Sequence, residues 1–312
     1  MKNKTRYDRL KSNKIKKSKT IILFTSVAIL VIAGGTLMAE KVFHYIDKTQ
    51  AMQIESTQEV SNDNGENNEN KEDSNDVTKG DQDQYSEKPA FIERYLDQQM
   101  RGEMPDGADG QKVVYLTFDD GPSETVTPQV LDILKQENVH ATFFVVGKYV
   151  DGSEKGKELV KRAVDEGNAI AIHSYSHDYN YLYPNRTVNT DNFMADVDKT
   201  NAALKKALGD DFETKAIRLP GGHMTWKNTK ALDDIFKENG YSYIDWNALS
   251  KDAEGPKKNA EQLAQEAINT SGTKEKVVLL MHDTYGKEET AKSLPAIIKH
   301  FKDQGYQFKV IK

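Results

Sequence analysis

The chain has 312 residues and a formal net charge of −6, a length that suits one catalytic-sized domain with appendages. Residues 1–19 carry nine Lys or Arg and one Asp, which leaves 34 basic against 48 acidic residues elsewhere and argues against a nucleic-acid partner. The absence of cysteine excludes disulfides, thiolate nucleophiles and Cys-ligated metal sites.

An uncharged apolar stretch follows the basic N-terminal tail. Ile21–Ala39 has nineteen residues and would reach ~28 Å as a helix, close to the hydrocarbon thickness of a bilayer. The basic tail stays in the cytoplasm by the positive-inside rule, so the remainder lies outside. We therefore predict a basic cytoplasmic tail over 1–19 and a transmembrane signal-anchor over 20–39. A cleaved signal peptide is the competing interpretation, although Leu37 makes the cleavage signature before Glu40 poor.

The next segment is strongly acidic and has almost nothing to bury. Residues 55–87 contain eleven Asp or Glu against two Lys, so this stretch cannot recover its ordering entropy through a packed core. We predict an acidic disordered linker over 40–88 and a short connecting segment over 89–110, in which Ala90–Met100 forms an amphipathic helix that docks on the following domain. The linker either lifts that domain off the membrane or serves as a spacer of no required length.

Apolar strand-like runs alternate with amphipathic helical patterns over 111–312. The predicted strands are Val113–Phe118, Ala141–Val146, Asn168–Ile172, Ala216–Leu219, Tyr241–Trp246, Val277–Met281 and Gln307–Ile311. The predicted helices are Thr127–Glu137, Glu158–Glu166, Asp191–Leu208, Thr229–Asn239, Ala260–Asn269 and Thr290–Gln304. Strict alternation predicts an α/β fold with a parallel sheet. By itself it fits an open doubly wound sheet or an incomplete (β/α) barrel equally well.

Polar clusters follow several of these strands, at the strand ends where α/β proteins collect their chemistry. The first strand runs into Asp119 and Asp120, whose side chains should diverge. The third runs into His173 and His177, and two imidazoles at this spacing can meet at one point. With a strand-end carboxylate they form an Asp/His/His ligand set that leaves open positions, as in catalytic metal sites. Alone, the Asp119-Asp120 pair is equally compatible with an ordinary polar turn, and two histidines four apart are more often structural or accidental.

Three further features follow later strands. Arg218 ends the fourth strand, where its guanidinium either depresses the pKa of an aspartate or forms an ordinary surface salt bridge. The Pro220–Gly222 turn offers bare backbone N–H groups that could approach an oxyanion. The sixth strand ends at His282, a placement that suits general acid–base catalysis.

Four motifs in this order resemble the polysaccharide deacetylase family, the NodB-homology domain of carbohydrate esterase family 4. The motifs are Thr117-Phe-Asp-Asp-Gly121, His173-Ser-x-Ser-His177, Arg218-x-Pro-x-Gly222 and Leu280-x-His282. The resemblance covers about residues 111–312. It implies a polysaccharide deacetylase catalytic domain with a distorted, incomplete (β/α) barrel of about seven parallel strands, which hydrolyses N-acetyl groups with the help of a metal ion.

The resemblance also assigns site residues. The implied metal ligands are Asp120, His173 and His177. They would hold one divalent ion, most commonly Zn²⁺, with Co²⁺ or Mn²⁺ as alternatives. The implied catalytic residues are Asp119 as general base, Arg218 as its orienting partner, His282 as general acid and Asp252 as the residue that tunes it.

On the substrate side, the resemblance places the oxyanion at the N–H of Gly221, with Pro220 and Leu280 in the same part of the site. Two positions depart from the family pattern. The family often has an aromatic residue where Gly221 stands, and commonly has tryptophan after the aspartate that matches Asp252, where this chain has Ala253. We therefore expect a more open groove with a weaker grip on short free oligosaccharides.

Topology and resemblance together predict a single-pass cell-membrane enzyme whose catalytic domain is extracellular and faces the cell wall. The predicted substrate is N-acetylglucosamine of cell-wall peptidoglycan, and the expected partners are that glycan and the membrane, with no nucleic acid and no protein partner. The alternatives are a deacetylase of another surface or biofilm polysaccharide, such as poly-N-acetylglucosamine or a chitin-like polymer, or an O-acetyl esterase. A catalytically inactive sugar-binding module is the alternative from a different class.

Overall fold

The computed structural model describes residues 85–312. The predicted cytoplasmic tail, the predicted membrane span and nearly all of the predicted linker lie outside the described residues. Between residues 85 and 312, no helix combines the length and the apolar character needed to cross a membrane.

Strands and helices alternate along this part of the chain. The strands are β1 (Ser86–Glu87), β2 (Val113–Asp119), β3 (Ala141–Val146), β4 (Ala169–Ser174), β5 (Ala216–Ile217), β6 (Ser242–Tyr243), β7 (Ala248–Leu249), β8 (Lys276–His282), β9 (Gln307–Phe308) and β10 (Val310–Ile311). The helices are α2 (Pro89–Met100), α3 (Thr127–Glu137), α4 (Gly147–Asp151), α5 (Glu154–Asp165), α6 (Tyr179–Leu182), α7 (Thr190–Leu208), α8 (Thr229–Glu238), α9 (Ala260–Ser271) and α10 (Glu288–Asp303). Two 3₁₀ turns are η2 (Pro184–Arg186) and η3 (His223–Thr225).

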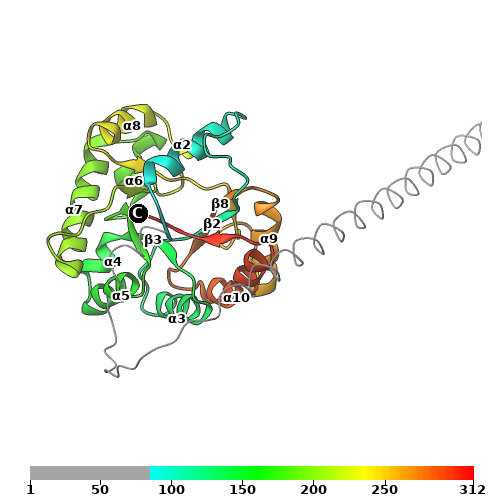
Figure 1. Cartoon of the computed structure of the whole chain (residues 1–312). Helices are drawn as coiled ribbons and strands as arrows, with labels where there is room; N and C mark the ends of the chain where they lie inside the picture. The colour runs from blue at the N-terminus through cyan, green and yellow to red at the C-terminus, as the bar shows by residue number, and fades with distance from the viewer. Residues whose placement is uncertain (1–84) are drawn as a thin grey trace, which may run out of the picture. The chain divides into compact units, whose positions relative to one another are not determined.

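The main sheet is curled and entirely parallel. Its order is β6-β5-β4-β3-β2-β8-β7. Strand β9 pairs with the start of β2, before the residues at which β3 begins to pair. The seven strands of the main path form half of a barrel, and Figure 1 shows α3, α5, α7, α9 and α10 arranged around its outside. The predicted incomplete barrel of about seven parallel strands is therefore confirmed.

Strand β2 is buried on both faces, which explains its continuous apolar run. Leu116 and Phe118 enter a large apolar cluster with the outer helices, whereas Val113 and Tyr115 enter a smaller inner cluster. Because side chains alternate along a strand, Asp119 lies on the inner side, at the end of the strand. The same alternation that builds the two cores therefore directs this carboxylate into the mouth of the half-barrel.

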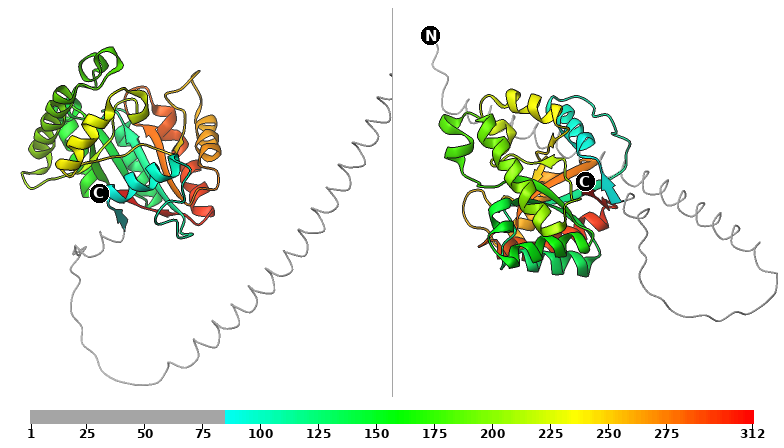
Figure 2. Two further views of the ribbon diagram at one scale, coloured as in Figure 1. Left: turned by 90° about the horizontal axis from the view of Figure 1, so that it is seen from above. Right: turned by 90° about the vertical axis from the view of Figure 1, so that its left-hand side faces the viewer.

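Helix α2 covers the open side of the half-barrel. Ile92 and Leu96 are 1% and 8% exposed and pack in the inner cluster. The amide oxygen of Gln99 accepts a 2.8 Å hydrogen bond from Asn247, which lies between the two edge strands β6 and β7. Figure 1 shows α2 (cyan) on the opposite side of the sheet from α3, and Figure 2 shows it beside α8. The predicted helix Ala90–Met100 is thus confirmed as a docked element.

Two helices begin earlier than the apolar pattern predicts, because polar caps lie upstream. The hydroxyl of Ser153 accepts a 3.0 Å backbone hydrogen bond, so α5 begins at Glu154 rather than at Glu158. The side chain of Asn189 does the same at 3.0 Å for α7, which begins at Thr190. Such caps satisfy N–H groups that the first turn of a helix leaves unpaired.

Two predicted strands differ from the structure: Tyr241–Trp246 is shortened to β6 and followed by the unpredicted strand β7, and Gln307–Ile311 is divided into β9 and β10. After β6, the side chain of Asn247 takes the place of a strand backbone beside β8. Its oxygen accepts from the N–H of Val278 and its nitrogen donates to the carbonyl of Lys276, both at 2.9 Å. Strand β7 then resumes the pairing with β8. The last predicted strand divides because β9 pairs with β2 whereas β10 pairs with β1.

Candidate active site

Polar side chains at the C-terminal ends of β2, β4 and β8 line one cavity of about 210 Å³. Parallel strands bring their C-terminal ends to the same edge of a sheet, so residues far apart in sequence meet there. The strand register, for example, sets Asp119 of β2 beside His282 of β8. The predicted site residues that line the cavity are Asp119, Asp120, His173, His177, Gly221, Asp252, Leu280 and His282. Arg218 is fully buried behind them.

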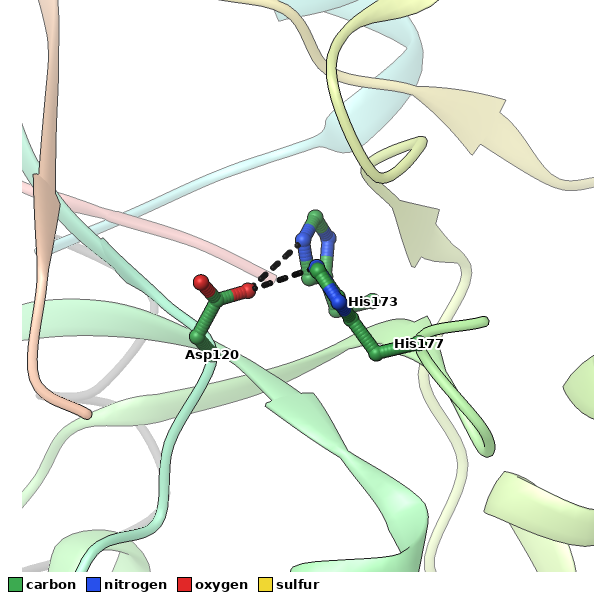
Figure 3. A group of neighbouring side chains, drawn as sticks. All are labelled: Asp120, His173 and His177. Atoms are coloured by element: carbon green, nitrogen blue, oxygen red, sulfur yellow. Dashed lines mark ion pairs between the residues drawn. The ribbon is translucent and has the colours of Figure 1, made fainter. Parts of the chain in front are cut away.

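Three of these side chains, Asp120, His173 and His177, converge on one point (Figure 3). The Oδ1 atom of Asp120 lies 3.2 Å from Nε2 of His173 and 3.0 Å from Nε2 of His177, yet it accepts no hydrogen bond within the described chain. This unpartnered carboxylate oxygen beside two imidazole nitrogens is available as a ligand.

The surrounding backbone orients the imidazole of His173, and a tight turn positions the backbone of His177. Nδ1 of His173 lies 2.8 Å from the carbonyl oxygen of Arg218, and donating its proton there leaves the Nε2 lone pair facing Asp120. His177 has φ +49° and closes a tight turn in which its N–H donates to the hydroxyl of Ser174 at 3.0 Å. The oxygen of Asp120 and the Nε2 atoms of the two histidines converge without a hydrogen bond between them, an arrangement that suits a cation. A carboxylate with two imidazoles is a donor set for Zn²⁺ and related divalent ions.

Asp119 leaves β2 in a different direction from its neighbour. The chain turns into the left-handed region at Asp120, where φ is +70°, so the two side chains diverge. Oδ1 of Asp119 accepts a 2.8 Å hydrogen bond from Arg218, which also donates to Thr117 at 2.8 Å. The other oxygen, Oδ2, lies 4.0 Å from Nε2 of His173. Arg218 thus fixes one carboxylate oxygen of Asp119, and the other oxygen is directed toward the metal ligands.

Asp252 holds His282 in place beside the cavity. Its Oδ1 accepts from Nδ1 of His282 at 2.8 Å, and its Oδ2 accepts from the backbone N–H of His282 at 2.9 Å and from Thr290 at 2.8 Å. Burial alone would lower the pKa of His282, but the hydrogen bond and charge of Asp252 outweigh burial and raise it to about 9. Burial would also raise the pKa of Asp252, and His282 more than offsets this and lowers it. His282 is therefore a cationic imidazole at neutral pH with Nε2 free to donate.

Known proteins share this chain's sequence pattern. Residues 106–244 match a family model described as polysaccharide deacetylase. Over 202 residues the chain is 34% identical to a peptidoglycan-N-acetylglucosamine deacetylase of Bacillus cereus, an alignment that covers 64% of this chain and 68% of that protein. This chain belongs to the polysaccharide deacetylase family.

Solved structures and longer relatives agree with the assignment of a polysaccharide deacetylase, a metal-dependent hydrolase. A CE4 esterase from Streptococcus mutans matches with a TM-score of 0.67 at 37% identity, covering 74% of this chain and 94% of that one. A peptidoglycan-N-acetylglucosamine deacetylase of Listeria monocytogenes is 33% identical over 219 residues, which cover 70% of this chain but 42% of that protein. The deacetylase thus spans less than half the length of its Listeria relative.

The Pro220–Gly222 turn forms another wall of the deacetylase cavity. Gly221 and Gly222 both have φ +82°, a conformation that glycine adopts without strain. The N–H of Gly222 is used inside the turn, whereas that of Gly221 has no partner among residues 85–312. Pro220 lies behind this wall and its carbonyl accepts from Trp226 at 2.8 Å. Leu280 adds an apolar patch to the cavity.

Aromatic rings from other segments stand beside Gly221. A Cβ atom at this glycine would lie 3.0 Å from Trp226 and 3.4 Å from the hydroxyl of Tyr179. Tyr179 also lines the cavity, with its ring centroid 5.3 Å from that of His177. The expectation of an open wall at Gly221 is therefore wrong, because these rings occupy the space. Ala253 is exposed and leaves its own side of the cavity without a bulky wall.

Five lining residues escaped the sequence analysis, namely Tyr179, Trp246, Leu249, Lys251 and Glu254. Their only sequence signal is proximity, since Tyr179 lies two positions after His177 and Trp246 ends the fifth predicted strand. Contacts between separate segments, rather than any local pattern, bring these side chains to the site.

Size alone does not mark the active site of the deacetylase. A larger cavity of about 510 Å³ lies at the N-terminal ends of β3 and β4, lined in part by Asn138, His140 and Asn168. The single cluster of potential metal ligands in the described residues is at the other end of the strands. The cluster of metal ligands, rather than cavity volume, therefore identifies the smaller cavity as the active site.

Proposed function

We propose that this deacetylase removes N-acetyl groups from N-acetylglucosamine residues of cell-wall peptidoglycan. The observation that carries the proposal is a single cavity that brings together the Asp/His/His cluster, Asp119, which is paired with Arg218, and His282, which is paired with Asp252. The Bacillus cereus and Listeria monocytogenes relatives named as peptidoglycan-N-acetylglucosamine deacetylases support this choice of substrate.

Asp120, His173 and His177 would hold the divalent ion. Two imidazole nitrogens and one carboxylate oxygen are donors that Zn²⁺ favours, with Co²⁺ and Mn²⁺ as alternatives. When bound, such an ion supplies Lewis acidity that polarises the acetyl carbonyl and makes water more acidic. Three protein ligands leave coordination positions open for the substrate.

Asp119 acts as the general base. Because Arg218 fixes its Oδ1, the Oδ2 atom is the one that faces the cavity and can accept a proton. As the oxygen of a water molecule bonds to the acetyl carbon, one O–H bond of that water breaks and its proton passes to Asp119. General-base catalysis of this kind contributes roughly 10²- to 10⁴-fold in rate.

His282 acts as the general acid. It donates its Nε2 proton to the amide nitrogen, the C–N bond breaks, and the products are acetate and a free amine on the sugar. Asp252 keeps the imidazole protonated for this step. The N–H of Gly221 donates to the oxygen that becomes negative during the reaction, and Leu280 offers an apolar surface to the acetyl methyl group.

We also propose that residues 20–39 anchor the enzyme in the cell membrane, with the catalytic domain outside. The uncharged stretch Ile21–Ala39 and the basic residues that precede it support this topology. An enzyme held outside the membrane on an acidic linker would reach the wall polymer directly, which supports peptidoglycan over an intracellular substrate.

Mass spectrometry of muropeptides tests the proposed substrate. Peptidoglycan treated with the full chain and Zn²⁺ should release acetate and yield muropeptides whose glucosamine lacks the acetyl group, whereas the Asp119→Asn variant should leave the pattern of untreated wall. Turnover of poly-N-acetylglucosamine or chitin without turnover of peptidoglycan would favour another surface polymer. Acetate released only from O-acetyl esters would favour an esterase, and glycan binding without any hydrolysis would contradict the proposal.

A further inference from the structure

Two hydrogen-bond donors without a protein partner meet at one corner of the catalytic cavity. One is the N–H of Gly221, which has no partner among residues 85–312. The other is the hydroxyl of Tyr179, which bonds to no residue in the same part of the chain. Both residues line the cavity that holds the Asp/His/His cluster. The reaction steps described above use the N–H and give the hydroxyl no part.

The hydroxyl of Tyr179 lies beside the backbone of Gly221. A Cβ atom at Gly221 would be only 3.4 Å from this hydroxyl. Because glycine carries no side chain, the tyrosine oxygen comes close to the backbone that offers the free N–H. An acceptor that reaches this corner of the cavity therefore meets two donors from separate segments of the chain.

The start of helix α6 places Tyr179 next to the ligand loop. Oδ1 of Asp178 accepts a 2.9 Å hydrogen bond from the N–H of Asn180, and this cap makes Tyr179 the first residue of the helix. Asp178 follows His177 directly, so the ligand loop and the tyrosine form one continuous unit. The ring centroid of Tyr179 lies 5.3 Å from that of His177.

Aromatic packing holds the ring from another side. The ring centroids of Tyr179 and Trp226 are 5.2 Å apart in an edge-to-face contact, an arrangement that aromatic pairs favour. Trp226 is itself fixed, because its Nε1 donates to the carbonyl of Pro220 at 2.8 Å and its ring stacks on Tyr183 at 3.9 Å. The ring of Tyr179 is thus held without any hydrogen bond from its hydroxyl, which leaves that hydroxyl free as a preorganised donor.

A donor in this corner acts on the charge that develops during the reaction. When water adds to the acetyl carbon, the carbonyl oxygen becomes an oxyanion. A tyrosine hydroxyl can donate one hydrogen bond, and a hydrogen bond to a charged acceptor is stronger than one to a neutral carbonyl. Such a donor stabilises the transition state more than the bound substrate, so it raises kcat rather than affinity.

We propose that Tyr179 is a further catalytic residue, whose hydroxyl donates a hydrogen bond to the oxyanion alongside the N–H of Gly221. The proposal rests on the proposed function and adds a side-chain donor to its oxyanion site. The O–H bond of Tyr179 stays intact throughout. The negative charge leaves the oxygen when the carbonyl forms again and the C–N bond breaks, with the proton for the amine supplied by His282.

Steady-state kinetics of the zinc-loaded full chain on soluble peptidoglycan fragments test the role of the hydroxyl. Tyr179→Phe keeps the ring and removes only the oxygen, so kcat should fall about 10- to 100-fold while KM and zinc content stay as in the parent. The matched control is Tyr181→Phe, the same substitution in the same helix at a side chain that does not line the cavity. This control should retain the parent kcat. An unchanged kcat in Tyr179→Phe, or a rise in KM alone, would overturn the proposal.

Binding of a tetrahedral inhibitor supplies a readout that does not depend on turnover. A methylphosphonamidate of glucosamine carries a charged tetrahedral group where the substrate carries its acetyl group, and it mimics the transition state. Calorimetry should show about 10- to 100-fold weaker binding to Tyr179→Phe and parent affinity in Tyr181→Phe. If the parent releases no acetate but Tyr179→Phe still weakens inhibitor binding, the proposed function fails and the donor role stands. If the parent hydrolyses the glycan and Tyr179→Phe changes neither kcat nor inhibitor affinity, the donor role is wrong and the proposed function stands.

Discussion

At the scale of single residues, Arg218 has the strictest requirements, because a guanidinium without solvent exposure needs all of its partners inside the protein. It donates to Asp119 and Thr117 and, through Nε, to the carbonyl of Ile244 at 2.8 Å. Its Cζ atom also lies 4.0 Å from the ring centroid of Phe144. The residue is therefore as important for folding as for orienting the base.

Replacing Arg218 should destabilise the protein as well as inactivate it. Arg218→Met leaves Asp119 as an unpaired buried charge, and breaking such a pair costs about 3–5 kcal/mol in the free energy of unfolding. Urea denaturation measures this loss. The matched control is Arg101→Met, which removes an exposed arginine paired with Asp97 and Glu103 and should cost far less, because exposed ion pairs contribute little to stability. Equal losses in the two variants would contradict the assignment of a buried pair.

His282 should set the alkaline limit of activity. It must be protonated to donate, and Asp252 raises its pKa to about 9, so the rate should fall as the pH rises through about 9. The variant Asp252→Asn lacks the carboxylate that offsets the effect of burial on His282. The pKa of His282 should therefore drop, and the rate should begin to fall at a lower pH. A pH–rate profile checks this shift.

A second histidine–aspartate pair provides the control for that profile. His223 and Asp233 are also 2.8 Å apart, but neither lines the catalytic cavity. Asp233→Asn should therefore leave the alkaline limit where it is. If Asp233→Asn moved the limit and Asp252→Asn did not, His282 would not be the acid.

The sequence allowed some of these residues to be placed but not others. Asp119, Asp120 and His282 directly follow or end apolar runs, and a buried strand that stops at a carboxylate or an imidazole is visible in the sequence. Tyr179 and Trp226 replace the wall that Gly221 lacks, and this could not be predicted. Their position depends on how α6 and the loop after β5 pack together, which is a tertiary property.

At the scale of secondary-structure elements, α2 should be essential to the stability of the half-barrel. Ile92 is 1% exposed in the inner cluster, and truncating such a side chain costs about 2–5 kcal/mol. Ile92→Ala should therefore lower the free energy of unfolding by that amount in urea denaturation. Met104→Ala, at a side chain 82% exposed, should change it by less than about 0.5 kcal/mol. A loss no larger than that of the control would mean that α2 only rests on the surface.

The predictability of the elements follows from their length. The strand Ala141–Val146 and the helix Thr127–Glu137 have the predicted bounds, because each carries enough residues to show its period. Strand β7, with two residues, has no period to recognise and was missed. It exists because it pairs with β8 and because Thr270 exchanges hydrogen bonds with Leu249 at 3.0 and 2.8 Å. Such pairing depends on the partner strand and not on the local sequence.

At the scale of the whole molecule, the alternation of strands and helices predicted a parallel α/β fold, and the motifs predicted the incomplete barrel. The amphipathic pattern of Ala90–Met100 predicted a docked helix, but nothing in the sequence predicted that this helix covers the open side of the half-barrel. That helix is α2, which lies outside the family match and whose role is fixed by Ile92 and Leu96 packing against strands that follow it in the chain.

The proposed membrane anchor gives a prediction at the same scale. The mature protein should retain residues 1–39, since the apolar stretch is long enough to span a bilayer and the cleavage signature before Glu40 is poor. N-terminal sequencing or intact-mass measurement of the protein from membranes checks this. A new N-terminus near Glu40 would refute the anchor and indicate a secreted enzyme.

The central claim is that adjacent aspartates divide the chemistry, with Asp120 holding a divalent ion alongside His173 and His177 and Asp119 acting as base. The most direct test is the zinc content and kcat of the full chain in three forms: parent, Asp119→Asn and Asp120→Asn. Asp119→Asn should retain zinc as the parent does while kcat falls roughly 10²-fold or more, whereas Asp120→Asn should lose zinc. Loss of zinc from Asp119→Asn together with its retention by Asp120→Asn would contradict the account.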